Sequence, residues 1–218
     1  MRVYHFVNKE YGIQDLQKRR LKIARLHELN DPFELFGVEF SNEDIRSAFH
    51  KMKTELTKKR GLICFSKSWH NPVQWSHYAD KHQGLCFGFD IPDHHLGEVN
   101  YSRKRLVIDA ERLKNPGNIT FSFAKRFLFT KYSHWSYENE VRGFISLDKE
   151  TEEKGLYFLD FSDSLKLKEV IVGSESDITR QEISDSLSGY NINVNCFKAR
   201  LAFKSFRVVR QRKESLWL

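Results

Sequence analysis

Long hydrophobic runs are missing from this chain of 218 residues. Its densest apolar stretches, 62–65 and 85–89, have the length of strands, whereas a membrane helix needs roughly 18 apolar residues. The opening residues MRVYHFVN also lack the apolar core of a secretion signal. Both absences favour a cytoplasmic protein and speak against a membrane as its partner.

Cysteine is scarce as well. Cys64, Cys86 and Cys196 lie far apart, and an odd number without a C-x-x-C pair forms neither a complete disulfide framework nor the usual structural zinc site. Each lies in an apolar stretch, where a free cysteine acts as a small buried hydrophobe. We therefore expect buried, free thiols.

The familiar catalytic and metal-binding motifs are absent too. The sequence contains no H-E-x-x-H, no Walker loop, no G-x-G-x-x-G and no G-x-S-x-G. His77 and His82 are five residues apart, and His94 and His95 are adjacent, so neither pair has the i, i+4 spacing of metal ligands on a helix. We expect no metal cofactor.

The sequence does contain the material for a core and an excess of positive charge. Hydrophobic residues make up 40% of the chain and include 18 phenylalanines, which excludes a disordered protein. The net charge of +7 permits a polyanionic partner such as nucleic acid. No repeat, low-complexity tract or linker divides the chain. We predict a single α+β domain over residues 1–218, with central mixed or antiparallel sheets and flanking helices.

Periodicity and turn residues place the elements. The predicted strands are 3–7, 21–26, 62–66, 85–89, 141–147, 169–173 and 192–203. The predicted helices are 13–22, 43–60 with Ser41 or Asn42 as cap, a segment from Asn71 to near Gly84, and 176–187 with Ser176 or Asp177 as cap. Residues 121–129 are predicted to be a strand or a buried segment, and Asn30-Asp31-Pro32 a turn that starts a helix at Pro32.

Two features near the N-terminus are candidates for ligand binding. His5 lies between Tyr4 and Phe6, and strand alternation places it on the opposite face from both rings. A neutral imidazole there hydrogen-bonds a ligand hydroxyl, or it lies half-exposed at a strand end. The loop Asn30-Asp31-Pro32-Phe33-Glu34 either lines a pocket or is a turn whose side chains bond their own backbone.

The segment after the strand 62–66 concentrates hydroxyl and aromatic groups. Ser66 and Ser68 point to the same side of an extended segment, where they bind a ribose or phosphate or cap the following turn. Trp75 and Tyr78 share a helical face, as a core stripe or as the wall for a flat ring. The run 69–82 is so rich in Trp, Tyr and His that we interpret it as part of a site.

Carboxylates provide the candidate catalytic groups. If the run from Trp135 to Arg142 is extended, Glu138, Glu140 and Arg142 project from one face. Two carboxylates on one face repel each other unless Arg142 bridges them, which is the structural interpretation. In the functional interpretation, one carboxylate orients a substrate hydroxyl and the other stabilises positive charge or acts as a base.

The C-terminal region is basic. Arg200 and Lys204 belong to a series that also includes Lys198, Arg207, Arg210, Arg212 and Lys213. Lys198 and Arg200 are expected on the solvated face of a strand whose other face carries Phe197 and Ala199. The same arrangement also suits the binding of phosphate, because arginine presents bidentate donors.

Several of these motifs together resemble the bacterial domain of unknown function 2971 family. They are Tyr4-His5-Phe6, Asn30-Asp31-Pro32-Phe33-Glu34, Cys64-Phe-Ser66, Trp75-Ser-His-Tyr78-Ala-Asp, Gly84-Leu-Cys-Phe-Gly-Phe and Trp135-Ser-Tyr-Glu138-Asn-Glu140-Val-Arg142. The similarity extends to about Leu147, and the family name implies no reaction.

A His on the first strand, a Ser-x-Ser after a central strand and a later Glu-x-Glu are similar to the three-part signature of ADP-ribosyltransferase folds. The resemblance implies that His5, Ser66 and Ser68 bind NAD, that Glu140 contacts the nicotinamide ribose and favours the oxocarbenium-like state, and that Glu138 orients the acceptor. It also implies that Trp75 or Tyr78 stacks on nicotinamide. Lys67 stands where the common form of the signature has Thr.

These features lead to one leading hypothesis and two alternatives. The leading hypothesis is an NAD-consuming enzyme of the ADP-ribosyltransferase type, a toxin or phage-defence effector that modifies nucleic acid or protein and has an antitoxin or immunity partner. The first alternative is a non-catalytic nucleic-acid-binding or regulatory module that uses Arg142, Arg200 and Lys204. The second is a metal-dependent nuclease built on Glu138, Glu140 and the histidines.

Overall fold

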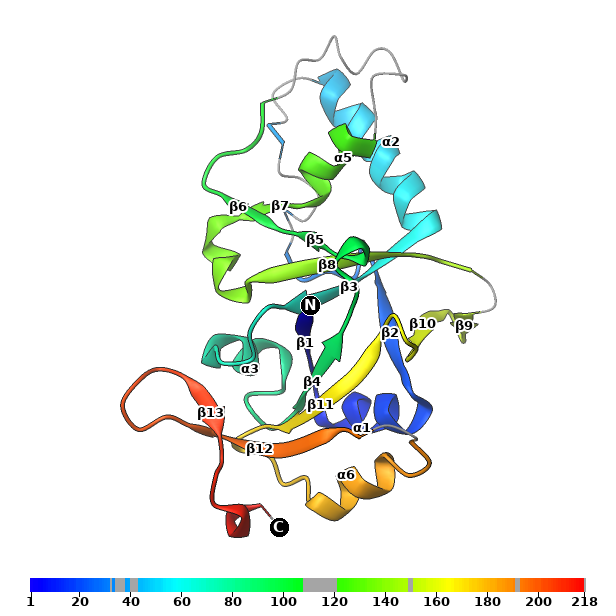
Figure 1. Cartoon of the computed structure of the whole chain (residues 1–218). Coiled ribbons are helices and arrows are strands. Elements are labelled where there is room, and N and C mark those ends of the chain that lie inside the picture. The colour runs from blue at the N-terminus through cyan, green and yellow to red at the C-terminus, as the bar shows by residue number, and fades with distance from the viewer. Residues whose placement is uncertain are drawn as a thin grey trace.

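The computed structural model describes residues 1–31, 33, 38–39, 43–107, 121–148, 151–190 and 193–217. These residues contain both helices and strands, and most of the strands belong to one large mixed sheet (Figure 1). The α+β fold class predicted from the sequence is confirmed. The helix start predicted at Pro32 and the caps predicted at Ser41 or Asn42 lie outside the described residues.

The large sheet runs through strands that are distant in sequence. Its order is β13 (Val208–Arg210), β12 (Asn195–Leu201), β11 (Lys166–Val172), β4 (Leu85–Asp90), β1 (Arg2–Val7), β3 (Arg60–Ser66), β2 (Arg20–Arg25), β10 (Leu156–Asp160) and β9 (Glu152–Glu153). β11 and β12 are parallel, and the other neighbours in this order are antiparallel. β8 (Glu140–Ser146) pairs along the whole of β3, and β5 (Gly97–Glu98) pairs with β8. A separate small parallel sheet joins β6 (Asn100–Ser102) to β7 (Thr130–Tyr132).

The sheet forks at β3. Because β8 occupies one edge of β3, both β1 and β2 must share the other. β2 pairs with the start of β3, where Ala24 lies opposite Leu62, and β1 pairs only with its end, where Tyr4 lies opposite Ser66. β1 and β2 therefore diverge along the middle of β3, which leaves a gap in the sheet beside residues 63–65.

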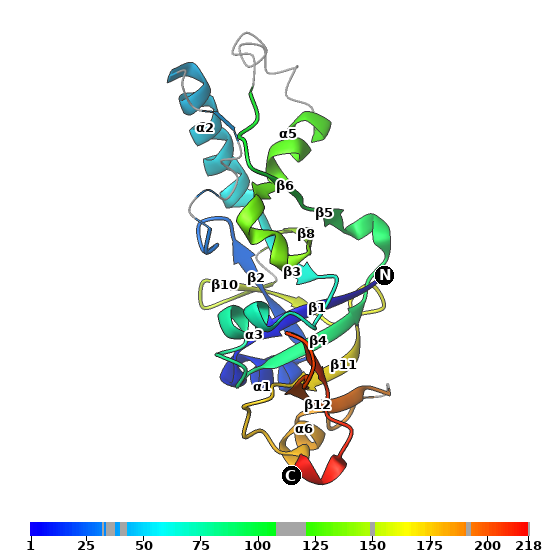
Figure 2. The same cartoon turned by 90° about the vertical axis from the view of Figure 1, so that its left-hand side faces the viewer.

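Helices lie at both ends of this sheet, as Figures 1 and 2 show from two directions. α2 (Glu43–Lys59) and α5 (Phe121–Leu128) lie at one end, and α1 (Lys9–Lys18) and α6 (Arg180–Ser186) pack together at the other. α3 (Pro72–Tyr78) lies beside β1. The short 3-10 helices are η1 (Asp93–His95), η3 (Ser133–Glu138) and η5 (Glu214–Leu216).

Local sequence explains where α3 begins. The side chain of Asn71 accepts a hydrogen bond from the Val73 N–H, and Pro72 occupies the first helical position, where its missing N–H has no consequence. The helix is short because the chain turns at Ala79 and passes through the left-handed region at Asp80, Lys81 and His82. This cap places Tyr78 at the C-terminal end of α3.

Three predicted elements differ from the structure. The helix predicted at 13–22 is α1, which begins after the cap Asn8 and ends where Arg19 adopts a φ of 54°. The segment 121–129 contains the helix α5 rather than a strand, because its apolar residues at 121, 124, 127 and 128 follow the helical period. The helix predicted at 176–187 is α6, which starts later because Thr179 and Glu182 form a capping box.

The core lies on both faces of the sheet. On one face, Leu16 of α1 and Ile183 of α6 are buried with residues of β1, β3, β4, β8 and β11. On the other, Trp75 of α3 packs with Trp69, Phe197 and Val208. The three cysteines are free, as predicted, but only Cys86 is buried; Cys64 and Cys196 are partly exposed. None of the helices in the described ranges is long and apolar enough to cross a membrane.

Candidate functional site

A cavity of about 350 Å³ lies where the sheet forks. It is bounded by β1, β2 and β3, by the end of α3 and by the residues around the start of β8. Its volume is at the lower end of the range for small-molecule sites. The predicted residues His5, Ser66, Tyr78, Glu138 and Glu140 all line it, together with Asn30, Gln74 and Lys131, among others.

His5 fills part of the gap between β1 and β2. Its Nδ1 lies 3.0 Å from the carbonyl oxygen of Cys64, in the middle of β3. A carbonyl only accepts, so Nδ1 carries the proton and Nε2 is left as an acceptor in the neutral ring. Burial lowers the pKa of His5, which keeps the ring neutral at pH 7. His5 thus lines the cavity as a neutral ring, and its role in binding a ligand hydroxyl stays a prediction.

The hydroxyl of Ser66 shapes the cavity wall. It donates to the Ser68 carbonyl at 2.9 Å and accepts from the Ser68 N–H and from Gln74 Nε2, both at 3.1 Å. One donor and two acceptor positions are thereby used. Ser68 is not among the residues that line the cavity, and its Oγ accepts from the His70 N–H at 3.3 Å. The two serines thus cap a turn, the second of the roles considered for them.

Gln74 is a site residue that the sequence interpretation missed. Its Nε2 donates to Ser66 Oγ and, at 2.8 Å, to the carbonyl oxygen of Tyr137. The Tyr137 carbonyl fixes the orientation of the amide, because it can only accept. Oε1 of Gln74 is buried and has no hydrogen-bond partner among the described residues. A buried acceptor without a partner costs stability, and this one belongs to a residue that lines the cavity.

Tyr78 lines the cavity and hydrogen-bonds one of the two carboxylates there. Its hydroxyl donates to Glu138 Oε1 and accepts from Asn30 Nδ2 at 2.7 Å. Burial and the carboxylate of Glu138 raise the pKa of Tyr78, so the group remains a phenol. The loop at Asn30 thus lines a pocket, while Asp31 Oδ1 accepts from the Phe33 N–H in the predicted turn. Pro32 and Glu34 lie outside the described residues.

Trp75 does not line the cavity, and its expected stacking on a ligand is not supported. Its side chain is fully buried, its Nε1 donates to the Trp69 carbonyl at 2.7 Å, and its ring packs against Phe6. No ring face is left for a ligand. Of the two aromatic candidates in α3, only Tyr78 reaches the cavity.

The two carboxylates reach the cavity in a way that the sequence did not predict. Glu138 is the last residue of η3 and Glu140 the first of β8, with Asn139 between them at a φ of 46°. The expected continuous extended face is therefore wrong. Instead, Lys131 of β7 bridges the pair, with Nζ 2.7 Å from Glu138 Oε2 and 3.3 Å from Glu140 Oε2.

Arg142 binds Glu140 tightly. Its Nε lies 2.6 Å from Glu140 Oε1, and a second guanidinium nitrogen lies 2.9 Å from Oε2. Arg142 is 1% exposed and is not among the residues that line the cavity, so its predicted contact with substrate or nucleic acid is not supported. The structural interpretation, in which Arg142 bridges the two carboxylates, is met in part: Arg142 binds Glu140, and Lys131 contacts both carboxylates.

The surroundings give the two carboxylates different acidities. Burial by itself would raise the pKa of Glu140, but the charges of Arg142 and Lys131 lower it to about 2. Burial raises the pKa of Glu138, against the opposing effects of Lys131 and Tyr78. Glu140 is thus a permanent anion at neutral pH, and Glu138 is the carboxylate that more readily takes up a proton.

Lys131 was also missed by the sequence interpretation. The signal was present, because Lys131 stands in the apolar and aromatic run 127–132, where a strand lysine is unusual. Such a buried cation requires an anionic partner. Glu138 and Glu140 are the nearest pair of acidic residues along the chain.

The remaining predicted residues lie elsewhere. Arg200 is at the end of β12 and Lys204 is in the loop after it, on a separate surface from the cavity. Among the described residues, no group of three or more His, Cys, Asp or Glu is arranged to hold a metal ion. Lys131 and Arg142, rather than further acidic residues, surround Glu138 and Glu140.

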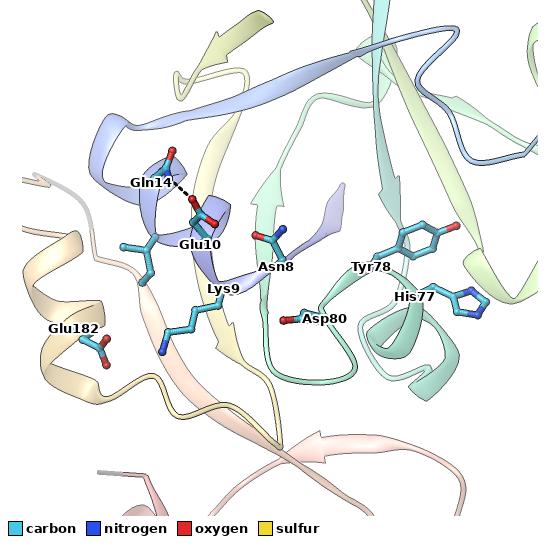
Figure 3. A pocket seen from close by; sticks show the side chains of 9 residues that line it. Asn8, Lys9, Glu10, Gln14, His77, Tyr78, Asp80 and Glu182 are labelled. Carbon is cyan, nitrogen blue, oxygen red and sulfur yellow. Dashed lines mark hydrogen bonds between the residues drawn. The ribbon is translucent and has the colours of Figure 1, made fainter.

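A second cavity, of about 820 Å³, opens between α1 and the end of α3 (Figure 3). It is the more open of the two, and its side chains do not converge. Glu10 bonds Gln14 on one side, while His77 and Tyr78 lie on the side opposite Glu182. We therefore place the candidate site at the fork of the sheet.

The model of a protein family of unknown function (DUF2971) matches residues 74–143. This segment runs from α3 into β8 and contains Gln74, Tyr78, Lys131, Glu138, Glu140 and Arg142. The match confirms the family resemblance over that part of the chain. No curated protein and no solved structure matches the chain.

Proposed function

We propose that this chain, whose DUF2971 segment contributes Gln74, Tyr78, Lys131, Glu138 and Glu140 to the cavity, binds NAD there and transfers its ADP-ribosyl group with release of nicotinamide. The observation that carries the proposal is the chemistry of the cavity. It brings together the neutral ring of His5, the amide of Gln74 and the carboxylates of Glu138 and Glu140, with Lys22 and Lys131 beside them. A ligand with several N–H and O–H donors complements these acceptors.

The nicotinamide riboside part of NAD has these properties. Its carboxamide N–H₂ would donate to the unpartnered Oε1 of Gln74, and a ribose hydroxyl would donate to Nε2 of His5. The ring of Tyr78 would stack on the flat, positively charged pyridinium. The volume of about 350 Å³ suits this half of the molecule, so the adenosine diphosphate would extend out of the cavity.

The two carboxylates then have separate roles. The bond between the ribose C1′ and the nicotinamide nitrogen breaks, and its electron pair leaves with nicotinamide. The ionised Glu140 stabilises the positive charge that develops at C1′. Glu138 accepts the proton of the attacking hydroxyl or amine, whose oxygen or nitrogen forms the new bond to C1′. Water in place of the acceptor gives free ADP-ribose.

This reaction also accommodates the remaining predictions for the protein. A transferase of this kind modifies nucleic acid or protein, as toxins and phage-defence effectors do, and a producing cell would restrain it with an antitoxin or immunity partner. These roles rest on the resemblance to ADP-ribosyltransferases.

The test is the release of nicotinamide from NAD by purified protein, measured by chromatography with RNA, DNA or cell lysate as acceptor. We expect release by the wild type and a loss of about 100-fold or more in Glu138→Gln, in line with the removal of a general base. Gln74→Ala is expected to raise KM for NAD more than it lowers kcat, because Gln74 binds the leaving group without taking part in proton transfer.

Glu10→Gln is the matched control. It also neutralises a carboxylate at a cavity, but at the open cavity of Figure 3. Its activity should equal that of the wild type. The proposal fails if the folded wild type releases no nicotinamide with any acceptor, or if Glu10→Gln loses as much activity as Glu138→Gln.

A further inference from the structure

The net charge of this protein is concentrated in one hairpin. Between residues 196 and 213 there are seven Lys and Arg and no Asp or Glu. The rest of the chain contains 29 basic and 29 acidic residues, so this short segment carries the entire +7. A charge so localised marks an electrostatic binding surface rather than a general property of the protein.

The same hairpin exposes two phenylalanines at its tip. β12 and β13 pair from Ala199 opposite Arg210 to Leu201 opposite Val208, and the chain between them projects from the body of the molecule (Figure 1). Phe203 and Phe206 in this loop are 90% and 98% exposed. Large apolar side chains exposed together in this way mark interaction sites.

The base of the hairpin is held firmly. The Val208 N–H donates to the His70 carbonyl at 2.9 Å, and His70 Nδ1 lies 2.7 Å from the Val208 carbonyl. Phe197 and Val208 are buried in the core beneath α3. Ala202 N–H bonds the Arg207 carbonyl at 2.9 Å across the loop. The tip is therefore presented by a fixed base rather than by a loose tail.

Cations alternate with the aromatic rings. Lys204 follows Phe203 directly, and Arg207 follows Phe206. The Arg200 guanidinium lies 4.5 Å from the centre of the Phe203 ring. This repeat of a ring and a cation matches the repeat of a base and a phosphate in a single nucleic-acid strand. A lipid surface would instead favour adjoining apolar residues with the cations around them, whereas Lys204 and Ser205 separate the two rings.

We propose that the β12–β13 hairpin binds single-stranded nucleic acid, with bases stacked on Phe203 and Phe206 and phosphates bound by Arg200, Lys204 and Arg207. This inference does not depend on the proposed reaction with NAD. His70, which holds β13, follows the turn formed by Ser66 and Ser68, so the hairpin is attached to the segment that walls the cavity.

The experiment measures fluorescence anisotropy of labelled oligo(dT), oligo(U) and a duplex of the same length, all longer than ~16 nucleotides. The single strands should bind more tightly than the duplex. Contacts to three or four phosphates give a plot of log affinity against log salt with a slope of about −2 to −3. The two single strands distinguish DNA from RNA as the preferred partner.

Two sets of variants separate stacking from charge. Phe203→Ala and Phe206→Ala should each weaken binding by about 5- to 150-fold without changing the salt slope. Removal of Arg200, Lys204 and Arg207 together should make the slope shallower by about 2. None of these changes should alter the melting temperature or the release of nicotinamide with water as acceptor.

The control replaces three exposed lysines of α2, Lys51, Lys58 and Lys59, which lie at the opposite end of the molecule (Figures 1 and 2). It should leave the affinity nearly unchanged. Equal losses in the control and in the hairpin variants would overturn the proposal, as would unchanged binding in both phenylalanine variants. Binding to vesicles that contain phosphatidylserine, with no binding to either single strand, would assign the hairpin to a membrane surface instead.

Discussion

Replacement of Glu140 by Gln should destabilise the protein strongly, whatever its effect on activity. Glu140 is 5% exposed and is held by Arg142 through two hydrogen bonds and by Lys131 through a third. The side chain of Arg142 is fully buried. A neutral amide in place of Glu140 removes the carboxylate charge that this buried guanidinium contacts through two hydrogen bonds, and it directs N–H donors at other donors.

The size of the effect follows from two independent considerations. Removal of one partner of a buried ion pair costs about 3–5 kcal/mol. The lowering of the pKa of Glu140 from 4.5 to about 2 corresponds to about 3 kcal/mol of stability at neutral pH. For a protein of this length, 3–5 kcal/mol lowers the melting temperature by about 6–20 °C.

Scanning calorimetry or thermal denaturation followed by circular dichroism would measure this change. The double variant Glu140→Gln/Arg142→Gln should recover part of the loss, because it removes the buried positive charge as well. A depressed carboxyl pKa gives stability that is present above pH 4.5 and is lost as the pH falls towards 2, so Glu140→Gln should also flatten the acid limb of the stability profile. A melting temperature of Glu140→Gln within about 2 °C of the wild type would refute the reasoning.

Three further predictions concern other parts of the structure. Burial raises the pKa of Asp15 from 3.8 to about 7, so the wild type loses stability as the pH rises through this window. In urea denaturation, Asp15→Asn should therefore raise the free energy of unfolding by up to about 4 kcal/mol at pH 8 and by little at pH 4. An equal effect at both pH values would contradict this prediction. Tyr78→Phe removes a hydrogen bond that lowers the pKa of Glu138, so the acid limb of the profile of nicotinamide release against pH should move to higher pH. An unmoved limb would exclude Glu138 as the base. Gly173→Ala would place a methyl group 2.0 Å from the His82 carbonyl oxygen, so thermal denaturation should show a free energy of unfolding lower by about 1–3 kcal/mol or more. Gly143→Ala, whose added methyl group would have its nearest neighbour at 3.7 Å, should leave the stability unchanged.

The sequence predicted much of the fold because most elements follow local rules. Caps such as Asn71 and alternation such as that of Leu21 and Ile23 are visible without any tertiary contact. Where prediction was wrong, two local signals competed. Alternating phenylalanines at 121 and 123 imitated a strand, although the same segment also had the helical period that the structure adopts.

The site was predicted less completely, because its geometry depends on contacts between distant residues. His5 meets Cys64, and Asn30 meets Tyr78, across separations of 59 and 48 residues that no periodicity encodes. Trp75 and Tyr78 are neighbours on α3, and their spacing does not reveal that Trp75 is buried in the core while Tyr78 lines the cavity. Gln74 gave no signal of its own, since a single amide is informative only when its partners are known.

The fork in the sheet has a mechanical consequence. The only residues that pair β1 with β3 are Tyr4 and Ser66, whereas β8 is paired with β3 along seven residues. Within the sheet, the half with β8 and α2 thus meets the half with β4 and β11 at this residue pair and at the short β2–β3 ladder, while the buried core continues across both halves. Because a close-packed core resists deformation, the cavity between the two halves keeps a fixed width. A ligand that contacts His5 on one side and Glu138 on the other would connect the two halves and stabilise their relative position.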